Sequence, residues 1–246
     1  MRNIWTIAKR EYTTYFNSPL AYVVMLILFA VIGLIFALNL LSVTNNPFLA
    51  QPLDATMVAG PLVFMLLFCT PAITMRLISD ESRTGTLELL LTAPIRDWEL
   101  VTGKWLGAFL FMLTTIALTL IFPFWVHGMT DPGIDIARTA SSYVGLILVV
   151  AAFLGIGVGI SALFSNQFAA FFATMGILVV MWFLIGAPAN LLPVGGELFG
   201  YLDMNSHFYG GFNRGAINLT DIVYYVSLTA LGLFTGNIAI DYRRWK

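Results

Sequence analysis

From Ser79 to Lys104 the sequence reads S-D-E-S-R-T-G-T-L-E-L-L-L-T-A-P-I-R-D-W-E-L-V-T-G-K. It is the one long polar and charged interval between apolar stretches. With Arg76 at its edge it holds nine charged side chains, whereas the whole chain has 12 Lys or Arg and 13 Asp or Glu. This concentration of charge identifies the segment as the main part of the chain that faces water.

The middle of this segment predicts a short helix that stands in water. A small or hydroxyl-bearing start can satisfy the first amides, a carboxylate in the first turn suits the helix dipole, and leucines spaced i, i+3 and i+4 share one face. These residues are Thr84, Gly85, Thr86, Leu87, Glu88, Leu90 and Leu91. Pro94 ends this helix, and Asp97 can cap the next one. The leucine face needs a cover, either a partner protein or the headgroups of a membrane.

The composition is that of an integral membrane protein. The chain is 59% hydrophobic and 10% charged, with a mean hydropathy of +0.87, whereas soluble domains carry about 25% charged residues. The net charge of -1 does not indicate a positively charged surface that would bind nucleic acid. The single cysteine, Cys69, lies in an apolar stretch and is predicted to serve packing.

Six apolar stretches are long enough to cross a bilayer, because a spanning helix needs about 20 such residues. They cover about 20–41, 55–78, 105–126, 142–164, 168–187 and 222–240. The sequence therefore predicts an all-α protein whose 246 residues form a single transmembrane domain. The first stretch is too long for the apolar region of a cleavable signal peptide.

The distribution of Lys and Arg predicts the orientation. Ten of them lie at the N-terminus, in the central polar segment and its edge, or at the C-terminus, which share one side of a six-span chain. Only Arg138 and Arg214 lie on the other side. By the positive-inside rule both termini and the central segment are expected to be cytoplasmic.

Residues 1–18 have the pattern of an amphipathic helix that lies in the membrane interface. Aromatic and apolar side chains share a broad face, and the polar residues lie apart from them. The residues that define this helix are Trp5, Lys9, Arg10 and Glu11. Asn17-Ser18-Pro19 separates it from the first span. Anchoring at the membrane surface alone remains an alternative role.

Two further patterns concern packing. Gly155 and Gly159 form a G-x-x-x-G pair in the fourth span, which predicts close approach of another helix, most simply within one protomer. The segment 188–220 is too broken by Gly and Pro to span and too apolar for an ordinary loop. It predicts short helices that dip into the outer leaflet, where protein or water must shield the irregular backbone.

Several kinds of chemistry are missing from the sequence. Gly103-Lys104 lacks the upstream glycine and the following Ser or Thr of a P-loop, so ATP hydrolysis by this chain alone is not expected. No metalloprotease or serine-hydrolase motif is present. The interiors of the six spans carry no Asp, Glu, Lys or Arg. Secondary transporters and voltage-gated channels place such residues there, so the energy is expected to come from a separate subunit.

Two stretches carry a family resemblance. D-E-S-R-T-G-T-L-E-L-L-L-T-A-P at 80–94, with Gly103-Lys104, resembles the cytoplasmic loop of ABC-2 type transporter permeases. A-K-R-E-Y-T-T-Y-F-N-S-P at 8–19 resembles the start of the same family and looks closest to its gliding-motility-associated branch. The resemblance covers the whole chain in length and span order.

The resemblance implies a coupling helix that docks into a separate ABC ATPase subunit. Its docking surface would comprise Arg83, Thr84, Gly85, Thr86, Leu87, Glu88, Leu90 and Leu91. The helix at 1–18 would lean on the same subunit, and 188–220 would form re-entrant outer helices. Two permease copies, identical or related, would pair with two ATPase copies that hold ATP and Mg. This chain itself would need no metal and no cofactor.

The resemblance thus implies an exporter subunit in the cytoplasmic, or inner, membrane, with an extracytoplasmic accessory protein as a further partner. The alternative is a membrane anchor or mechanotransmission subunit of an ATPase-driven envelope machine that moves no small molecule. Both share the coupling helix, so that motif does not separate them. A self-contained channel or carrier is disfavoured because the span interiors carry no ionisable residues.

Overall fold

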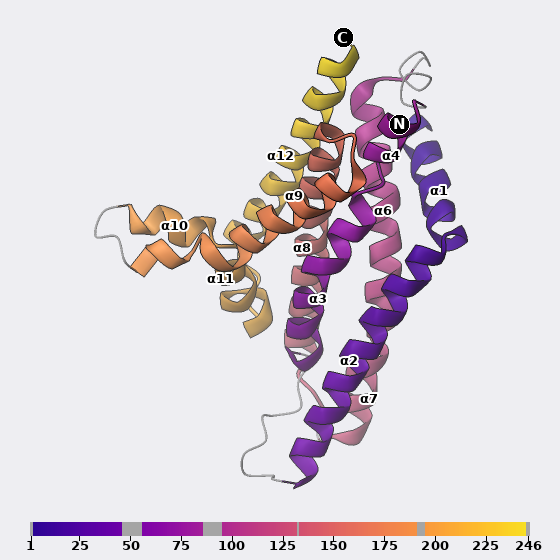
Figure 1. The fold of residues 1–246 in the computed structure, drawn as a ribbon. Coiled ribbons are helices and arrows are strands. Elements are labelled where there is room, and N and C mark those ends of the chain that lie inside the picture. The colour runs from indigo at the N-terminus through magenta and orange to yellow at the C-terminus, as the bar shows by residue number, and fades with distance from the viewer. Residues whose placement is uncertain (1, 46–55, 86–94, 132, 191–194, 245–246) are drawn as a thin grey trace.

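The structure is a computed structural model of the 246-residue chain that describes residues 2–45, 56–85, 95–131, 133–190 and 195–244. These residues form helices and no strand (Figure 1). The α-helices are α1 (Arg2–Asn17), α2 (Pro19–Asn45), α3 (Thr56–Thr74), α4 (Ser79–Thr84), α6 (Asp97–Thr119), α7 (Ile121–Met129), α8 (Ile136–Leu163), α9 (Gln167–Val179), α10 (Gly196–Leu202), α11 (Met204–Gly210) and α12 (Leu219–Arg244). A π-helical turn, η1 (Val180–Leu184), extends α9, and η2 (Ala187–Asn190) and η3 (Phe212–Arg214) are 3-10 turns.

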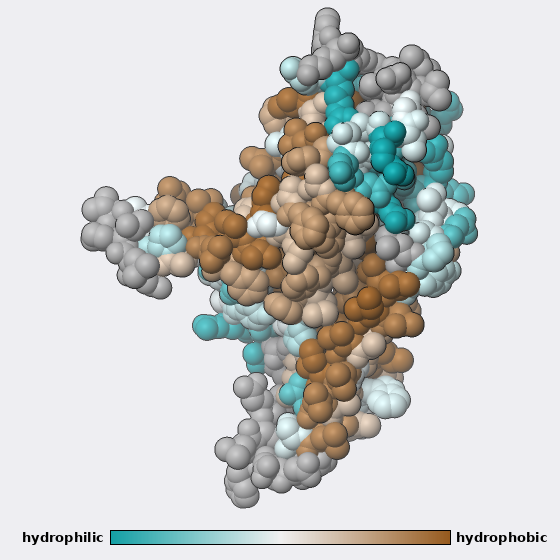
Figure 2. All heavy atoms as spheres, viewed as in Figure 1, coloured by the Kyte–Doolittle hydropathy of each residue, from teal (hydrophilic) through white to brown (hydrophobic). Residues whose placement is uncertain are grey.

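Six helical segments of the described chain are long and apolar enough to cross a membrane, which confirms the predicted number of spans. They cover Ala21–Ser42, Met57–Thr84, Asp97–Met129, Ile136–Leu163, Gln167–Ala189 and Leu219–Arg243. Several helices extend beyond the predicted bounds because polar residues continue the helix past the apolar core. Both chain ends lie at the same end of the bundle (Figure 1), where hydrophilic residues also gather (Figure 2).

Helix α8 forms the centre of the bundle. Its most apolar 18-residue stretch is 78% buried, and the helix contacts α3, α6, α9 and α12. Gly155 and Gly159 lie against α12: a Cβ on Gly155 would be 3.0 Å from the Thr229 carbonyl oxygen, and one on Gly159 would be 2.6 Å from that of Gly232. The absence of side chains therefore lets the two backbones approach closely within one protomer.

Two of the spans are interrupted near a proline. The third span is divided into α6 and α7 at Leu120, because Pro123 lacks the amide hydrogen that would continue the α6 ladder. In the second span Pro71 lies near the end of α3, and the Met75 amide donates to its carbonyl oxygen at 2.9 Å. A turn then leads into α4, so the chain leaves the second span through a short irregular connection.

The described part of the segment predicted to be broken consists of short helices. η2, α10, α11 and η3 follow the fifth span, and α10 and α11 stand to one side of the bundle (Figure 1). Their visible surface is largely apolar (Figure 2). Insertion of these helices into the outer leaflet stays a prediction, as does the exact extent of the transmembrane domain.

Candidate functional site

The candidate site is built around α4, the six-residue helix that directly precedes the segment 86–94. Asp80 and Glu81 lie in its first turn and Arg83 in its last, which is the favourable arrangement for the helix dipole. Gly85 ends α4 in the left-handed region, with φ of 74°. Thr84 and Gly85 therefore lie at the end of a helix that was not predicted from the sequence. They had been predicted to lie at the start of a helix.

The described residues cover only part of the predicted docking surface. Arg83, Thr84 and Gly85 are described, and the exposed Arg83 guanidinium lies 3.4 Å from the Asp80 carboxylate. The remaining predicted residues lie outside the described part of the chain; these are Thr86, Leu87, Glu88, Leu90 and Leu91. Beyond this gap Arg96, rather than Asp97, is the N-cap of α6, and its amide donates to Glu99 at 3.2 Å.

A serine of the central helix holds the start of α4. The amides of Ile78 and Ser79 both donate to the Ser161 hydroxyl oxygen at 3.2 Å. Ile78, Ser79 and Ser161 are all fully buried. Because a helix start leaves amides without partners inside the helix, one α8 side chain satisfies two donors that water does not reach.

We expect Ser161→Ala to lower the free energy of unfolding by about 1–3 kcal/mol, because it leaves buried amides unsatisfied. The comparison is Ser227→Ala, which removes the hydroxyl of an exposed residue that donates to the Tyr224 carbonyl oxygen one turn earlier in α12. Thermal unfolding in detergent, followed by the tryptophan signal, measures both variants. Equal stability of Ser161→Ala and the unmodified chain would contradict the assigned role of Ser161.

Three side chains of α4 contact three helices besides α8. The Asp80 carboxylate accepts a hydrogen bond from the Gln167 amide of α9, and the Ser82 hydroxyl accepts one from Arg243 of α12. Glu81 contacts α6 through Lys104. Together with Ser161 of α8, these contacts connect one short helix to four spans. A displacement of α4 therefore acts on α6, α8, α9 and α12 at once.

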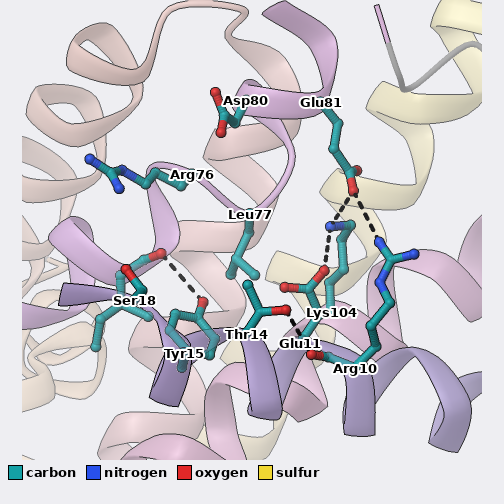
Figure 3. A pocket seen from close by; sticks show the side chains of 11 residues that line it. Arg10, Glu11, Thr14, Tyr15, Ser18, Arg76, Leu77, Asp80, Glu81 and Lys104 are labelled. Carbon is teal, nitrogen blue, oxygen red and sulfur yellow. Dashed lines mark hydrogen bonds and ion pairs between the residues drawn. The ribbon is translucent and has the colours of Figure 1, made fainter. Parts of the chain in front are cut away.

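Lys104 lies at the centre of an ionic cluster (Figure 3). Its Nζ is 2.9 Å from Glu11 Oε1 of α1 and 2.8 Å from Glu81 Oε1 of α4. The Lys104 side chain is only 3% exposed. Arg10 Nη2 is 4.0 Å from the same Glu81 oxygen. A buried ammonium between two carboxylates thus joins the N-terminal helix, α4 and α6.

Two glycines allow α1 to approach α6 at this cluster. A Cβ on Gly103 would be 2.8 Å from Ile7 Cβ, and one on Gly107 would be 2.9 Å from the Ala8 carbonyl oxygen. Gly103 and Gly107 are four residues apart, the same small-residue spacing as Gly155 and Gly159. This spacing is visible in the sequence, but neither this helix contact nor Lys104 as a site residue was predicted from it.

Helix α1 packs along α6 and α2, and its opposite side is exposed. Trp5 is 58% exposed, and Lys9 and Arg10 are also exposed. Glu11, predicted to lie on the polar face, instead points to Lys104. Tyr15 donates to the Ile73 carbonyl oxygen at 3.5 Å. Burial, with a smaller effect of the Glu11 carboxylate, raises the pKa of Tyr15 well above its usual range, so Tyr15 remains a donor.

A cavity of about 300 Å³ opens beside the ionic cluster between α1, the end of α3, α4 and α6. Its charged lining comes from Arg10, Glu11, Arg76, Asp80, Glu81 and Lys104, and Thr14, Tyr15 and Ser18 add hydroxyl groups (Figure 3). Positive and negative groups thus line the same cavity. Such a surface is suited to polar contacts with a protein partner and offers no catalytic nucleophile with an adjacent base.

The chain was compared with known families and with curated proteins. Residues 5–194 match the family described as ABC-2 family transporter protein. No curated protein gives a significant match. The matched region includes α1, α4, the ionic cluster of Lys104, and the first five spans.

Proposed function

Since the chain belongs to the ABC-2 family of transporter proteins, and is therefore a multi-pass permease subunit of an ABC transporter, we propose that it is an export subunit. A separate ATPase supplies the energy by docking on the segment 79–104. Export, rather than import, is the direction that the resemblance to ABC-2 permeases implies.

The observation that supports this proposal is the set of contacts made by α4. This helix forms the start of the proposed docking segment and is joined to Ser161, Gln167, Lys104 and Arg243, each on a different span. Through Lys104 it is also joined to Glu11 of α1. When an ATPase moves the docking segment, α4 transmits the displacement directly to four spans and to the N-terminal helix.

The complete assembly follows from the same proposal. Two permease copies, identical or related, bind two ATPase copies, and ATP and Mg bind to the ATPases. The Lys and Arg distribution favours a cytoplasmic position for both termini, α1 and α4, and the proposed membrane is the inner membrane. The apolar segment around α10 and α11 then lies in the outer half, as re-entrant helices at the exit.

A second candidate is a mechanotransmission subunit of the gliding type, in which the same contacts drive an envelope machine. The resemblance of residues 8–19 to the gliding-motility-associated branch favours it. Both candidates need the ATPase contact, but they differ in what the ATPase responds to. ATP hydrolysis that increases with an added amphipathic cargo supports export, whereas co-purification of a large extracytoplasmic protein without such an increase supports the second candidate.

The docking proposal is tested by affinity purification of the tagged chain from its own membrane, followed by mass spectrometry. We expect an ATP-binding protein in a stoichiometric amount. Leu87→Asp should reduce its recovery about tenfold or more, because a carboxylate replaces a buried apolar contact at a docking interface. Leu87→Met, which keeps an apolar side chain, is the matched control.

Amounts of inserted protein are compared for all three chains, so that a folding defect is recognised separately. Loss of the ATPase from Leu87→Asp but not from Leu87→Met supports the docking surface. Undiminished recovery with Leu87→Asp would overturn it. Absence of any ATPase from the unmodified sample, under conditions that keep other membrane complexes intact, would overturn the separate-ATPase proposal itself.

A further inference from the structure

The first turns of α12 hold the junction between α10 and α11 through three side chains. Tyr224 donates to the Leu202 carbonyl oxygen at 2.6 Å, and Tyr225 donates to that of Met204 at 2.7 Å. The third is Asp221, whose Oδ1 lies 2.6 Å from Nδ1 of His207 in α11. The junction is therefore fastened to a span by two tyrosine hydrogen bonds and one His–Asp pair.

His207 meets an acceptor at each ring nitrogen. Nδ1 faces the Asp221 carboxyl group, and Nε2 lies 2.8 Å from the Tyr201 carbonyl oxygen of α10. A carbonyl oxygen only accepts, so Nε2 must carry a hydrogen. The contact between Nδ1 and Asp221 needs a second hydrogen, whether it resides on the nitrogen or on the carboxyl oxygen. The arrangement therefore holds one proton more than a neutral imidazole beside a carboxylate.

The described groups around the pair supply no other hydrogen for these two contacts. Asn218 donates to the other Asp221 oxygen at 3.0 Å, and a Cβ on Gly211 would lie 2.4 Å from that same oxygen, so the carboxyl group occupies the space that a side chain at position 211 would need. The His207 ring stacks on Tyr224, with centroids 4.1 Å apart. His207 and Asp221 are 8% and 6% exposed. Removal of the proton thus places two lone pairs in contact at Nε2 or at Nδ1.

Among the described residues, the titratable groups that face His207 come from α10 and α12. From α10 there is Tyr201, with its ring edge against His207, and from α12 there are Asp221, Tyr224 and Tyr225. Asp203, at the start of α11, accepts from the Asn205 amide at 3.1 Å. The tyrosines act as neutral donors or stacking partners. The extra proton therefore resides on the His207–Asp221 pair.

We propose that His207 and Asp221 form a proton-dependent clasp that holds the α10–α11 junction on α12. The clasp is closed while the extra proton is present and opens when rising pH removes it. Low pH thus favours the closed arrangement. In the proposed orientation the clasp lies on the outer side, so it makes the exit-side helices respond to external pH rather than to ATP.

The sequence makes a direct test practicable, because His127 and His207 are its only histidines. In a His127→Gln chain with ¹⁵N-labelled histidine, reconstituted in lipid nanodiscs, every imidazole signal comes from His207. Asp221→Asn in the same background is the matched variant, because it keeps the shape and removes the carboxylate. We expect both His207 nitrogens to be protonated at about pH 6, and one to lose its proton by about pH 9. In Asp221→Asn the doubly protonated form should already be lost near neutral pH.

Hydrogen exchange on the unmodified chain supplies a second measurement that does not depend on folding of a variant. After division by the intrinsic exchange rate, amides of 201–211 should lose protection about tenfold between about pH 6 and pH 9. Amides in the middle of α8 should keep theirs. Two results would each overturn the clasp: a His207 ring that is neutral at about pH 6, or protection of 201–211 that does not change with pH.

Discussion

Gly232→Ala should prevent normal closure of the bundle between α8 and α12. A Cβ at this position would lie 2.3 Å from the Gly155 carbonyl carbon and 2.5 Å from the Ile156 amide nitrogen. These are backbone atoms of the central helix, so no side chain can turn aside to make room. Overpacking of this kind costs about 1–3 kcal/mol, and more where the backbone must move. We expect a value at or above the upper end, measured by thermal unfolding in detergent and by the yield of monodisperse protein.

The matched control is Gly176→Ala in α9, where a Cβ would meet nothing within 4 Å. Both changes add one methyl group to a helical glycine, so they share the gain in helix propensity, which reaches about 1 kcal/mol. Their difference isolates the crossing of α8 and α12. If Gly232→Ala were as stable as Gly176→Ala, the close backbone contact would be incorrect.

Lys104→Met should cause the other large loss. It removes the ammonium from between Glu11 and Glu81 and leaves two carboxylates with little access to water. Removing one partner of a buried ion pair costs about 3–5 kcal/mol. We expect a fall of that size in the free energy of unfolding, and separation of α1 from α6, which a cysteine crosslink between α1 and α6 measures.

The cause can be isolated with two further chains. Glu11→Gln and Glu81→Gln, added to Lys104→Met, remove the two carboxylate charges that faced Lys104, and this triple variant should recover at least half of the lost stability. Lys9→Met, on the exposed surface of α1, makes the same substitution away from the cluster and should change stability by less than about 0.5 kcal/mol. A triple variant no more stable than Lys104→Met would indicate that packing, rather than charge, explains the loss.

The sequence was sufficient to predict the spans because the signal is local. Each apolar stretch is long enough to cross a bilayer by itself, and no knowledge of neighbours is needed. The prediction of a close helix contact at Gly155 and Gly159 was local in the same way. Its partner was not predicted, although Gly232 and Gly236 of α12 have the same four-residue spacing. They lie against Gly155 and Gly159, and which two of several small-residue pairs meet is decided by the tertiary arrangement.

The candidate site was predicted less completely. The polar segment was recognised from its charge, but α4 was missed, because S-D-E-S-R-T has no apolar face and too few residues for a periodic signal. Gly85 was interpreted as part of a helix start, although glycine is equally typical of the position after a helix end. The role of Lys104 depends on α1 folding back along α6, and that tertiary arrangement cannot be inferred from residue types alone.

The central position of α8 also sets an order for biosynthesis. Ile136, its first residue, is synthesised only after more than half of the chain. Until then the second span has no α8 to cover Thr74, which packs against Gly157 in the finished bundle. The second and third spans, which both contact α8 in the finished bundle, are therefore synthesised before this common neighbour. Gly232 and Gly236 are synthesised later still, so the contact between α8 and α12 forms only after α12 leaves the ribosome.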